Sequence, residues 1–549
     1  MTAVMVIALL CLQRDVPVAK AAATASITGI VTSDAPQPQP LRRVRVMLNG
    51  SGLSTGRTAI TADDGSFVFD GLPAGRYTVA AAKEAYVTTN YGAARPTRPG
   101  TAVLLGSGET LSVTLRLPRG AVITGAVVDA DGGPVHGVVV TALAYRYVGL
   151  TGERRALPAG VSAVPSDDRG SYRIFGLPPG DYVIMAQARW IGPLPSNDVR
   201  TVAQDTLSSR AISLVPSYHP ASTDVARAGK VTVAAGEERG GVDVEMQYVP
   251  LATVSGAAPV IADVHTYVSL IRTGEVFGVD GSRGSHAGEN GRFTFTGILP
   301  GQYTVIARSN PPGGNLWGKA EIVVDGEDIS NIAIAMQPTL KISGRVVFEG
   351  TRPPPPLAGL QLPDVAVTNL GNTGMMLPDV TIAPGNRFSI ADITPGEYRI
   401  LRPDLPGVRA PAGGWWLKSI VANGHELLDA RVDIRQSAED AVVTFGDQAS
   451  EVSGRVTDAQ LSPLAAQTVL VFSTDRSTWF FNSRRIAAVR TDAEGRYVVR
   501  NLPPGEYRIA VTTDLEQGEW FDPEVLARLA GTTVRVAGVE KKTQDLVLK

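Results

Sequence analysis

Short segments of this chain alternate apolar and polar residues, and turn-forming residues separate the segments. The alternation is clear at residues 67–69 and 172–175, and it has the period of two that indicates a β-strand with one buried face. A turn rich in Asp, Asn or Glu that ends in glycine precedes such a segment. A Leu-Pro-x-Gly sequence follows it, as at residues 72–75. Proline cannot donate to a sheet ladder, so the strand is expected to be interrupted there, and a tyrosine then opens the next strand.

This unit occurs five times. The copies lie at residues 63–77, 167–182, 289–303, 385–398 and 492–507, and each ends in a tyrosine. The tyrosines are separated by 105, 121, 95 and 109 residues, which is the length of one β-sandwich per copy. We expect each tyrosine to be a packed core or corner residue. Upstream of each copy lies an opening strand with an internal glycine, which indicates a bulge or a close backbone approach: Gly29, Gly125, Gly256, Gly344 and Gly454.

The pattern therefore predicts an all-β protein, a tandem array of about five β-sandwiches. The predicted boundaries are a signal-like segment at 1–23 and five repeats, named first to fifth below, at 24–118, 119–250, 251–338, 339–449 and 450–549. The best helix signal lies near the C-terminus, where Asp522 can cap, Pro523 occupies the first turn and Gly531 follows the end. It predicts one short helix inserted in the fifth repeat.

Composition and charge support a globular protein with many turns. Glycine (58) and proline (38) together make up about 17% of the 549 residues. This share is above the average of about 12% but below the roughly 25–30% of low-complexity chains. With 44% hydrophobic residues, the chain can bury real cores. The formal net charge is −2 and no Lys/Arg stripe stands out, so no nucleic-acid partner is expected.

The N-terminal segment indicates export. Residues 3–12 are apolar, and residues 19–21 resemble a small-x-small cleavage site. No Lys or Arg precedes this short apolar core. A start upstream of Met1 would restore the charged segment that a signal peptide has there. Two alternatives stay open: a lipid attached to Cys11, or a cytoplasmic protein with an apolar N-terminus. Cys11 is the one cysteine, so no disulfide is expected, and no other stretch is apolar enough to predict a transmembrane helix.

The repeated residues resemble the carboxypeptidase regulatory-like domain. The resemblance rests on the Val/Ile-x-Gly opening strand, the turn before the aromatic residue, the Leu-Pro-x-Gly-x-Tyr segment and the strand at 135–140; it is strongest in the first, second and fifth repeats. Residues 218–224, 414–424 and 520–523 resemble longer features of multi-repeat bacterial members. The resemblance implies a transthyretin-like, Ig-like seven-stranded sandwich, often grouped with starch-binding-like folds. The family name comes from an accessory domain of carboxypeptidases and implies no peptidase activity.

Three short motifs suggest chemistry but lack the partners it needs. His286 and Glu289 have the spacing of a zinc pair and His425 could be a third ligand, but the pair falls on the turn of the third repeat. The Gly-x-Ser-x-Gly at 52–56 is followed by no helix pattern. The acidic turn at 129–132 lacks a later bidentate glutamate. We therefore expect that the protein is not an enzyme and binds no metal and no cofactor. A zinc carboxypeptidase-related hydrolase is the remote alternative.

Aromatic residues are the candidates for ligand binding. Trp479 and Phe481 lie in an insert of the fifth repeat and Trp415 lies in the fourth, and rings exposed on a sandwich could stack on sugars. Trp415 and Trp416 are adjacent in a predicted strand and point to opposite faces, so one is expected in the core. One hypothesis is a non-catalytic secreted, periplasmic or outer-surface protein that binds a carbohydrate or another surface polymer, with a polysaccharide or a cell-surface protein as its partner. The alternative is a structural or protein-interaction spacer of stacked sandwiches.

Overall fold

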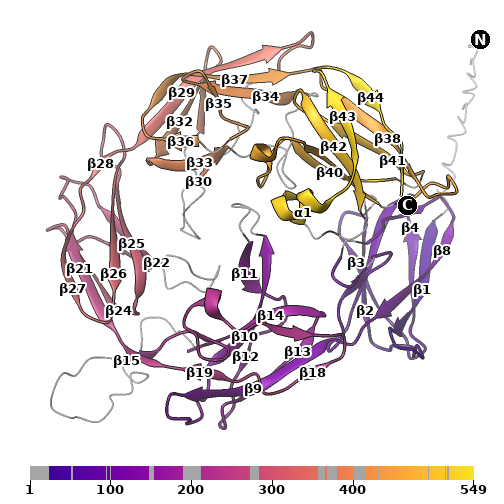
Figure 1. Ribbon diagram of the computed structural model, residues 1–549, viewed down its shortest axis with the longest axis horizontal. Helices are drawn as coiled ribbons and strands as arrows, with labels where there is room; N and C mark the ends of the chain where they lie inside the picture. The colour runs from indigo at the N-terminus through magenta and orange to yellow at the C-terminus, as the bar shows by residue number, and fades with distance from the viewer. Residues whose placement is uncertain are drawn as a thin grey trace, which may run out of the picture. The chain divides into compact units, whose positions relative to one another are not determined.

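The computed structural model describes residues 24–50, 53–93, 95–98, 100–147, 154–188, 212–272, 283–355, 365–367, 380–400, 415–430, 432–465, 467–492, 494–512, 515 and 518–548. Strands dominate every coloured part of Figure 1, and the all-β tandem-sandwich prediction is confirmed. The described residues up to 118, apart from 85–87, form one compact unit. The rest of the described chain forms a second unit. The signal-like segment and Cys11 lie outside the described residues.

The first unit holds the first repeat, which has two sheets. In the first sheet the opening strand β1 pairs antiparallel with the strand after the turn and parallel with the closing strand: β1 (Ala25–Ser33), β4 (Ser66–Leu72) and β8 (Thr110–Leu117). The second sheet is centred on β2 and β5, and comprises β3 (Arg57–Ile60), β2 (Arg45–Gly50), β5 (Gly75–Ala82), β6 (Thr89–Asn90) and β7 (Val103–Leu105). Apolar side chains such as Ile27, Leu48 and Val79 are buried between them.

The second unit repeats the same first-sheet arrangement four times. The opening strands are β9 (Ala121–Asp129), β21 (Ala252–Ala257), β29 (Leu340–Glu349) and β38 (Glu451–Thr457). Each pairs antiparallel with the strand after its turn: β13 (Ser171–Leu177), β24 (Arg292–Ile298), β32 (Arg387–Ile393) and β41 (Arg496–Arg500). Each also pairs parallel with closing strands: β18 (Glu238–Arg239) and β19 (Val244–Met246), β27 (Ile329–Ala333), β37 (Ala438–Gly446), and β44 (Lys541–Thr543) with β45 (Leu546–Val547).

The second sheets of these repeats differ more. The second repeat has β10 (Val139–Tyr147), β11 (Arg154–Pro158), β12 (Val164–Pro165), β14 (Gly180–Gln187), β16 (Ser217–Tyr218) and β17 (Val231–Val233), and a separate pair, β15 (Ile212–Leu214) with β20 (Tyr248–Pro250). The third has β22 (Tyr267–Arg272), β23 (Arg283–His286), β25 (Gly301–Ser309), β26 (Leu316–Val324) and β28 (Gln337–Pro338). The fourth has β30 (Val365–Val367), β33 (Gly396–Ile400) and β36 (Val432–Ile434). The fifth has β39 (Thr468–Ser473), β40 (Ile486–Arg490), β42 (Gly505–Thr512) and β43 (Thr532–Val536).

The fourth repeat also extends its first sheet with β31 (Val380–Ala383), β34 (Trp416–Ala422) and β35 (His425–Glu426). Strand β34 pairs antiparallel with the closing strand β37, so the fourth repeat carries a strand beyond its closing strand. That added strand brings Trp416 and Lys418 to the end of the fourth repeat that adjoins the fifth.

The glycine inside each opening strand marks a close backbone approach, as predicted. A Cβ at Gly29 would overlap the carbonyl oxygen of Val113 on the closing strand. The other four glycines meet the equivalent oxygens of Val242, Ile332, Ala441 and Gln544. A residue without a side chain is therefore needed at this position in all five repeats.

The five repeated tyrosines are buried and make the same hydrogen bond. Each hydroxyl donates to the carbonyl oxygen four residues earlier, at 2.6–2.9 Å: Tyr77 to Pro73, Tyr182 to Pro178, Tyr303 to Leu299, Tyr398 to Thr394 and Tyr507 to Pro503. The ring fills the core while the hydroxyl is satisfied locally. The prediction of a packed corner residue is thus confirmed.

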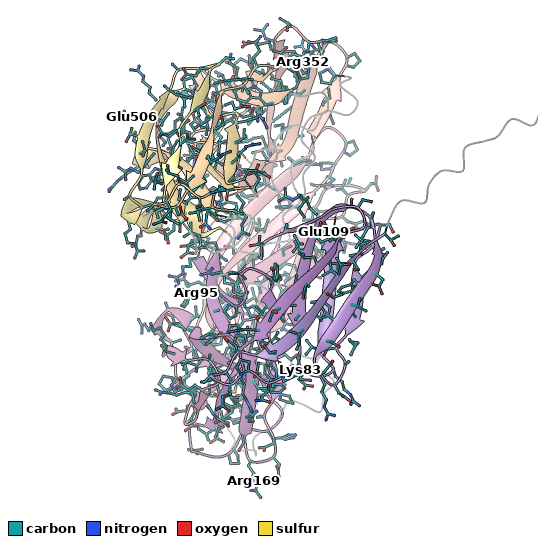
Figure 2. The ribbon with its side chains drawn as sticks, turned by 90° about the vertical axis from the view of Figure 1, so that its right-hand side faces the viewer. Lys83, Arg95, Glu109, Arg169, Arg352 and Glu506 are labelled. Carbon is teal, nitrogen blue, oxygen red and sulfur yellow. The ribbon has the colours of Figure 1, made fainter. Side chains whose placement is uncertain are left out.

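The predicted helix is also present. Helix α1 (Pro523–Arg528) begins after Asp522, whose side chain accepts a 2.8 Å hydrogen bond from the Glu524 amide. It buries Leu526 and ends before Leu529, earlier than Gly531 suggested. No helix in the described part of the chain is long and apolar enough to cross a membrane. Charged side chains such as Glu109, Arg169 and Glu506 lie on the exposed surface (Figure 2).

Candidate functional site

The predicted sugar-binding aromatics of the fifth repeat are packed in its interior. Trp479 is 7% exposed and Phe481 is 8% exposed. The Trp479 indole N–H donates a 2.6 Å hydrogen bond to the Ser473 carbonyl, and its ring meets Phe472 edge to face at 5.6 Å. Phe481 meets Phe521 in the same way at 5.0 Å. Sugar binding at these residues stays a prediction that their packing disfavours.

One of the two adjacent tryptophans of the fourth repeat lies in the core, as expected. Trp415 is 4% exposed and packs edge to face on Phe348, with ring centroids 5.1 Å apart. Trp416, the next residue, is partly exposed. The third predicted residue, Trp415, is therefore a core residue, whereas the neighbouring ring is the accessible one.

Trp416 lines a cavity of about 530 Å³ where the fourth and fifth repeats meet within the second unit. An apolar wall comes from the fifth repeat: Leu502, Pro503, Pro504 and Val539. The polar lining includes Glu349, Lys418, Asp447, Arg484 and Arg485. A concave apolar site with a few converging polar groups is typical of ligand-binding pockets, so this cavity is the candidate site.

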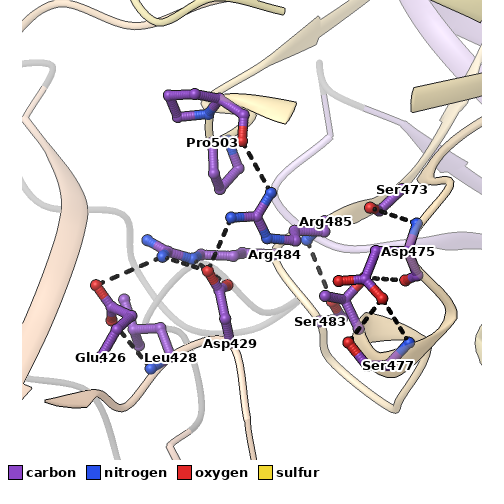
Figure 3. A network of polar contacts seen from close by, with 12 residues as sticks. Glu426, Leu428, Asp429, Ser473, Asp475, Ser477, Ser483, Arg484, Arg485 and Pro503 are labelled. Carbon is purple, nitrogen blue, oxygen red and sulfur yellow. Dashed lines mark hydrogen bonds and ion pairs between the residues drawn. The ribbon is translucent and has the colours of Figure 1, made fainter. Parts of the chain in front are cut away.

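A buried arginine in the cavity lining joins the two repeats. Arg484, at the end of the fifth-repeat insert, has a side chain only 8% exposed. Its Nε and Nη2 donate to the two carboxylate oxygens of Asp429 at 2.7 and 2.8 Å (Figure 3). Its Nη1 donates to the Lys418 carbonyl. Two parallel bonds of this kind fix geometry as well as energy.

Arg485 completes this cluster. Its Nη2 lies 3.0 Å from Asp429 Oδ2, and its Nη1 donates to the Pro504 carbonyl at 3.0 Å. Burial alone would raise the pKa of Asp429, but hydrogen bonds and positive charge from Arg484 and Arg485 outweigh it and lower that pKa. Asp429 is therefore a carboxylate in the folded protein, and we call these three residues the clamp.

Asp447 provides a second buried carboxylate at the cavity. It follows β37 and is 8% exposed. Its Oδ2 accepts hydrogen bonds from the backbone amides of Thr351 at 2.7 Å and Arg352 at 2.9 Å. These bonds, led by the one from Arg352, lower its pKa. Its Oδ1 is buried and has no hydrogen-bond partner among the described residues.

The Trp416 ring is held in place at the cavity. Its indole N–H donates a 2.9 Å hydrogen bond to the Gln448 carbonyl. The ring lies beside Gly446, where an added Cβ would be 3.3 Å from the indole nitrogen. Next to it on β34, Lys418 forms an ion pair with Glu349 at the end of β29, with half of each side chain exposed.

Two of the motifs considered for catalysis form ordinary local structure, and Gly52 of the third lies outside the described residues. His286 packs its ring against Tyr267, with centroids 5.2 Å apart, while Glu289 is exposed on the following turn. Among the described residues, no group of three or more His, Cys, Asp or Glu could hold a metal ion. Asp129 Oδ1 accepts the amides of Asp131 and Gly133, which makes the acidic segment a turn as predicted.

Comparison with family models identifies two segments of the chain. Residues 26–118 and 451–546 match the Carboxypeptidase regulatory-like domain. The predicted resemblance is therefore confirmed. The matched segments are the first and fifth repeats, two of the three copies in which the resemblance is strongest. A search of the curated proteins finds no match to the chain.

Similar solved structures include bacterial pilin proteins. A streptococcal ancillary pilin is 14% identical, with a TM-score of 0.22, and the match covers 57% of this chain and 99% of the pilin. The RrgB pilus protein from Streptococcus pneumoniae is 8% identical, with a TM-score of 0.15, covering 72% of this chain and 90% of that one. The Bacillus anthracis TIE protein is 10% identical, with a TM-score of 0.14, covering 96% and 69%.

Sequence reasoning missed the residues that build the cavity. Trp416 was visible as a partner of Trp415, but the sequence did not say which of the two is accessible. Arg484 and Asp429 are 55 residues apart, and no local pattern links them. Asp447 lies between a strand and the next repeat, where an acidic residue is unremarkable in sequence.

Proposed function

We propose that this chain is a non-catalytic protein of the cell envelope or exterior whose β-sandwich repeats hold a binding site for a polysaccharide or another surface polymer. The export-like segment at 1–23 and the two regulatory-like domains support this proposal. The cavity beside Trp416 supports the binding role, because it combines an accessible aromatic ring with converging polar groups.

One observation supports the absence of catalysis in the repeats. The polar groups that recur from repeat to repeat are engaged in structural hydrogen bonds: each repeated tyrosine donates to a carbonyl four residues earlier. Aspartates of the repeat turns likewise bond backbone amides, as Asp167 does with Ser171 and Asp492 with Arg496. Groups committed in this way serve the scaffold and not a reacting substrate.

The test combines location and binding. Fractionation of producing cells is expected to find the chain outside the cytoplasm, and the purified chain is expected to sediment with insoluble polysaccharides or isolated cell envelopes. A heat-unfolded sample is the control for non-specific adsorption. A cytoplasmic chain that binds neither material, or one that releases C-terminal residues from peptides when zinc is added, would overturn the proposal.

A spacer is the second candidate, and the clamp favours it. A buried bidentate pair between Arg484 and Asp429 is suited to holding two neighbouring repeats in a fixed arrangement. The spacer predicts a stiff junction and no ligand. Pairs of spin labels on the fourth and fifth repeats should then give a narrow distance distribution that broadens in Asp429→Asn, with no polymer bound by either protein.

A further inference from the structure

We propose that the cavity between the fourth and fifth repeats binds a short, uncharged stretch of a glycan, with Trp416 as the stacking platform and Glu349 and Lys418 as the hydrogen-bonding groups. The inference rests on the proposed function, that the chain binds a polymer, and adds the site and the class of ligand. It replaces the buried Trp479, Phe481 and Trp415 with the accessible neighbour of one of them.

The size and lining of the cavity suit a small polyhydroxyl ligand. Its volume of about 530 Å³ lies within the roughly 300–1,000 Å³ of typical small-ligand sites. Pro503, Pro504 and Val539 provide an apolar wall, and the charged groups come mostly from the fourth repeat. A sugar ring has apolar C–H faces and polar edges, so it can use both kinds of surface at once.

Trp416 is preorganised as a platform. Its N–H is already bonded to the Gln448 carbonyl, and Gly446 leaves room beside the ring. Ligand binding would therefore cost little conformational entropy of the Trp416 side chain. The Trp416 ring is partly exposed, lies in a concavity and is fixed through its indole N–H. Such a ring is suited to contact the C–H face of a sugar.

The polar groups offer both donors and acceptors for hydroxyls. Lys418 Nζ is a three-proton donor, and the Glu349 carboxylate beside it has two acceptor oxygens. Asp447 also lines the cavity, but its Oδ1 is fully buried and its Oδ2 accepts the backbone amides of Thr351 and Arg352, so it contributes negative charge and no hydrogen bond to a ligand.

The charges favour a neutral glycan over an acidic one. Lys418 is already paired with Glu349, and Arg484 and Arg485 are already paired with Asp429. The Asp447 carboxylate accepts the backbone amides of Thr351 and Arg352, and the positive charge of Arg352 acts on it. The positive charges of Lys418, Arg484 and Arg485 are each matched by a carboxylate, so the cavity gains little from an acidic sugar, whereas neutral hydroxyls can donate to Glu349.

The experiment is calorimetric titration of the full chain with neutral and acidic oligosaccharides. The probes are maltoheptaose, cellohexaose, chitohexaose and mannohexaose, with oligogalacturonate as the acidic probe. We expect at least one neutral probe to bind, and Trp416→Ala to weaken it by about tenfold or more. Trp416→Phe, which keeps a ring, should retain part of the affinity. Tyr267→Ala, an aromatic residue 44% exposed and outside the cavity, is the matched control.

The outcomes separate the site from the function. A neutral glycan bound equally by wild type and Trp416→Ala, with matching thermal unfolding curves, would overturn the site and leave the proposed function standing. The same conclusion follows if oligogalacturonate alone binds. If neither the probes nor isolated cell envelopes bind the wild type at millimolar ligand, the site and the proposed function both fail.

Discussion

The first and fifth repeats both match the regulatory-like domain, but they bury their second sheets differently. In β2 of the first repeat burial alternates: Val46 and Leu48 are buried, and Met47 between them is partly exposed. In β39 of the fifth repeat, the consecutive residues Val469 to Phe472 are all buried. The same fold element therefore has one covered face in the first repeat and two in the fifth.

Residues outside the basic sandwich cover the added face. Leu470 and Phe472 of β39 belong to a cluster with Trp479 of the insert and Leu526 of α1. The second repeat has a comparable outer cluster that includes Leu143, Val183 and Tyr218. The comparison explains why the insert of the fifth repeat is aromatic: its rings cover the outer face of a sheet and form a second core.

Removing the outer core should have the strongest effect on the fifth repeat. Trp479→Ala deletes a buried aromatic ring and should lower the free energy of opening of the fifth repeat by about 3–5 kcal/mol. Met47→Ala, on the corresponding strand of the first repeat, should lower that of its own repeat by less than about 1 kcal/mol, since the side chain is partly exposed. Hydrogen exchange resolved by peptide reports each repeat separately.

An equal, small loss in both variants would show that the insert adds no core. Faster exchange of the first repeat in the Trp479→Ala protein would contradict the local nature of the effect. Exchange of the third repeat is the internal control, because neither substitution touches it.

The fifth repeat also has the clamp, a buried ion pair with the fourth repeat. Asp429→Ala leaves Arg484 without its bidentate partner, and we expect a loss of about 3 kcal/mol in protection of β40. The exposed pair Glu349–Lys418 lies at the same cavity, and Glu349→Ala should change protection by less than about 1 kcal/mol. Similar effects from both variants would contradict the distinction between the buried and the exposed pair.

Acid should weaken the fifth-repeat junction through the same clamp. The pKa of Asp429 is lower in the folded protein than its unfolded value of about 3.9, so the folded state binds fewer protons. The stabilisation is present above that value and is lost as the pH falls through the lowered pKa. Exchange at β40 measured between pH 5 and 2.5 should show this loss in the wild type and not in Asp429→Asn.

The shared parts of the two repeats could be predicted from sequence because each depends on a short pattern. The corner tyrosine bonds a carbonyl only four residues away, so the Leu-Pro-x-Gly-x-Tyr sequence contains both partners. The internal glycine of the opening strand is needed wherever the closing strand passes alongside, which the repeat itself implies. The start of the helix could be predicted in the same way, because its cap Asp522 and its first residue Pro523 are adjacent in the sequence.

The parts that distinguish the repeats could not be predicted in this way. Whether Trp479 stacks on a ligand or covers a sheet depends on where its insert folds back, and that contact with Phe472 is tertiary. The cavity depends on an added strand, β34, and on a clamp between residues 55 apart. The alternation of side chains predicted that one of Trp415 and Trp416 is in the core, but it could not say which one.

The first and fifth repeats also differ at one position of the common first sheet. Tyr497 in the fifth repeat donates a 2.6 Å hydrogen bond to the Gln544 carbonyl beside Gly454. The first repeat has Phe67 at the equivalent place, with the tip of its ring beside Gly29 and the Val113 carbonyl. Tyr497→Phe removes one buried hydrogen bond and should lower the free energy of opening of the fifth repeat by about 1 kcal/mol.

The reciprocal change, Phe67→Tyr, places a hydroxyl at the ring tip that faces Val113 and should leave the first repeat unchanged or stabilise it by up to about 1 kcal/mol. Exchange at β1 and β38 measures both effects in the full chain. Destabilisation by Phe67→Tyr would mean that the first repeat has no room for the hydroxyl, so that its packing at the opening glycine differs from that of the fifth. Opposite signs for the two substitutions would instead show that the position is equivalent and that only the hydrogen bond distinguishes the repeats there.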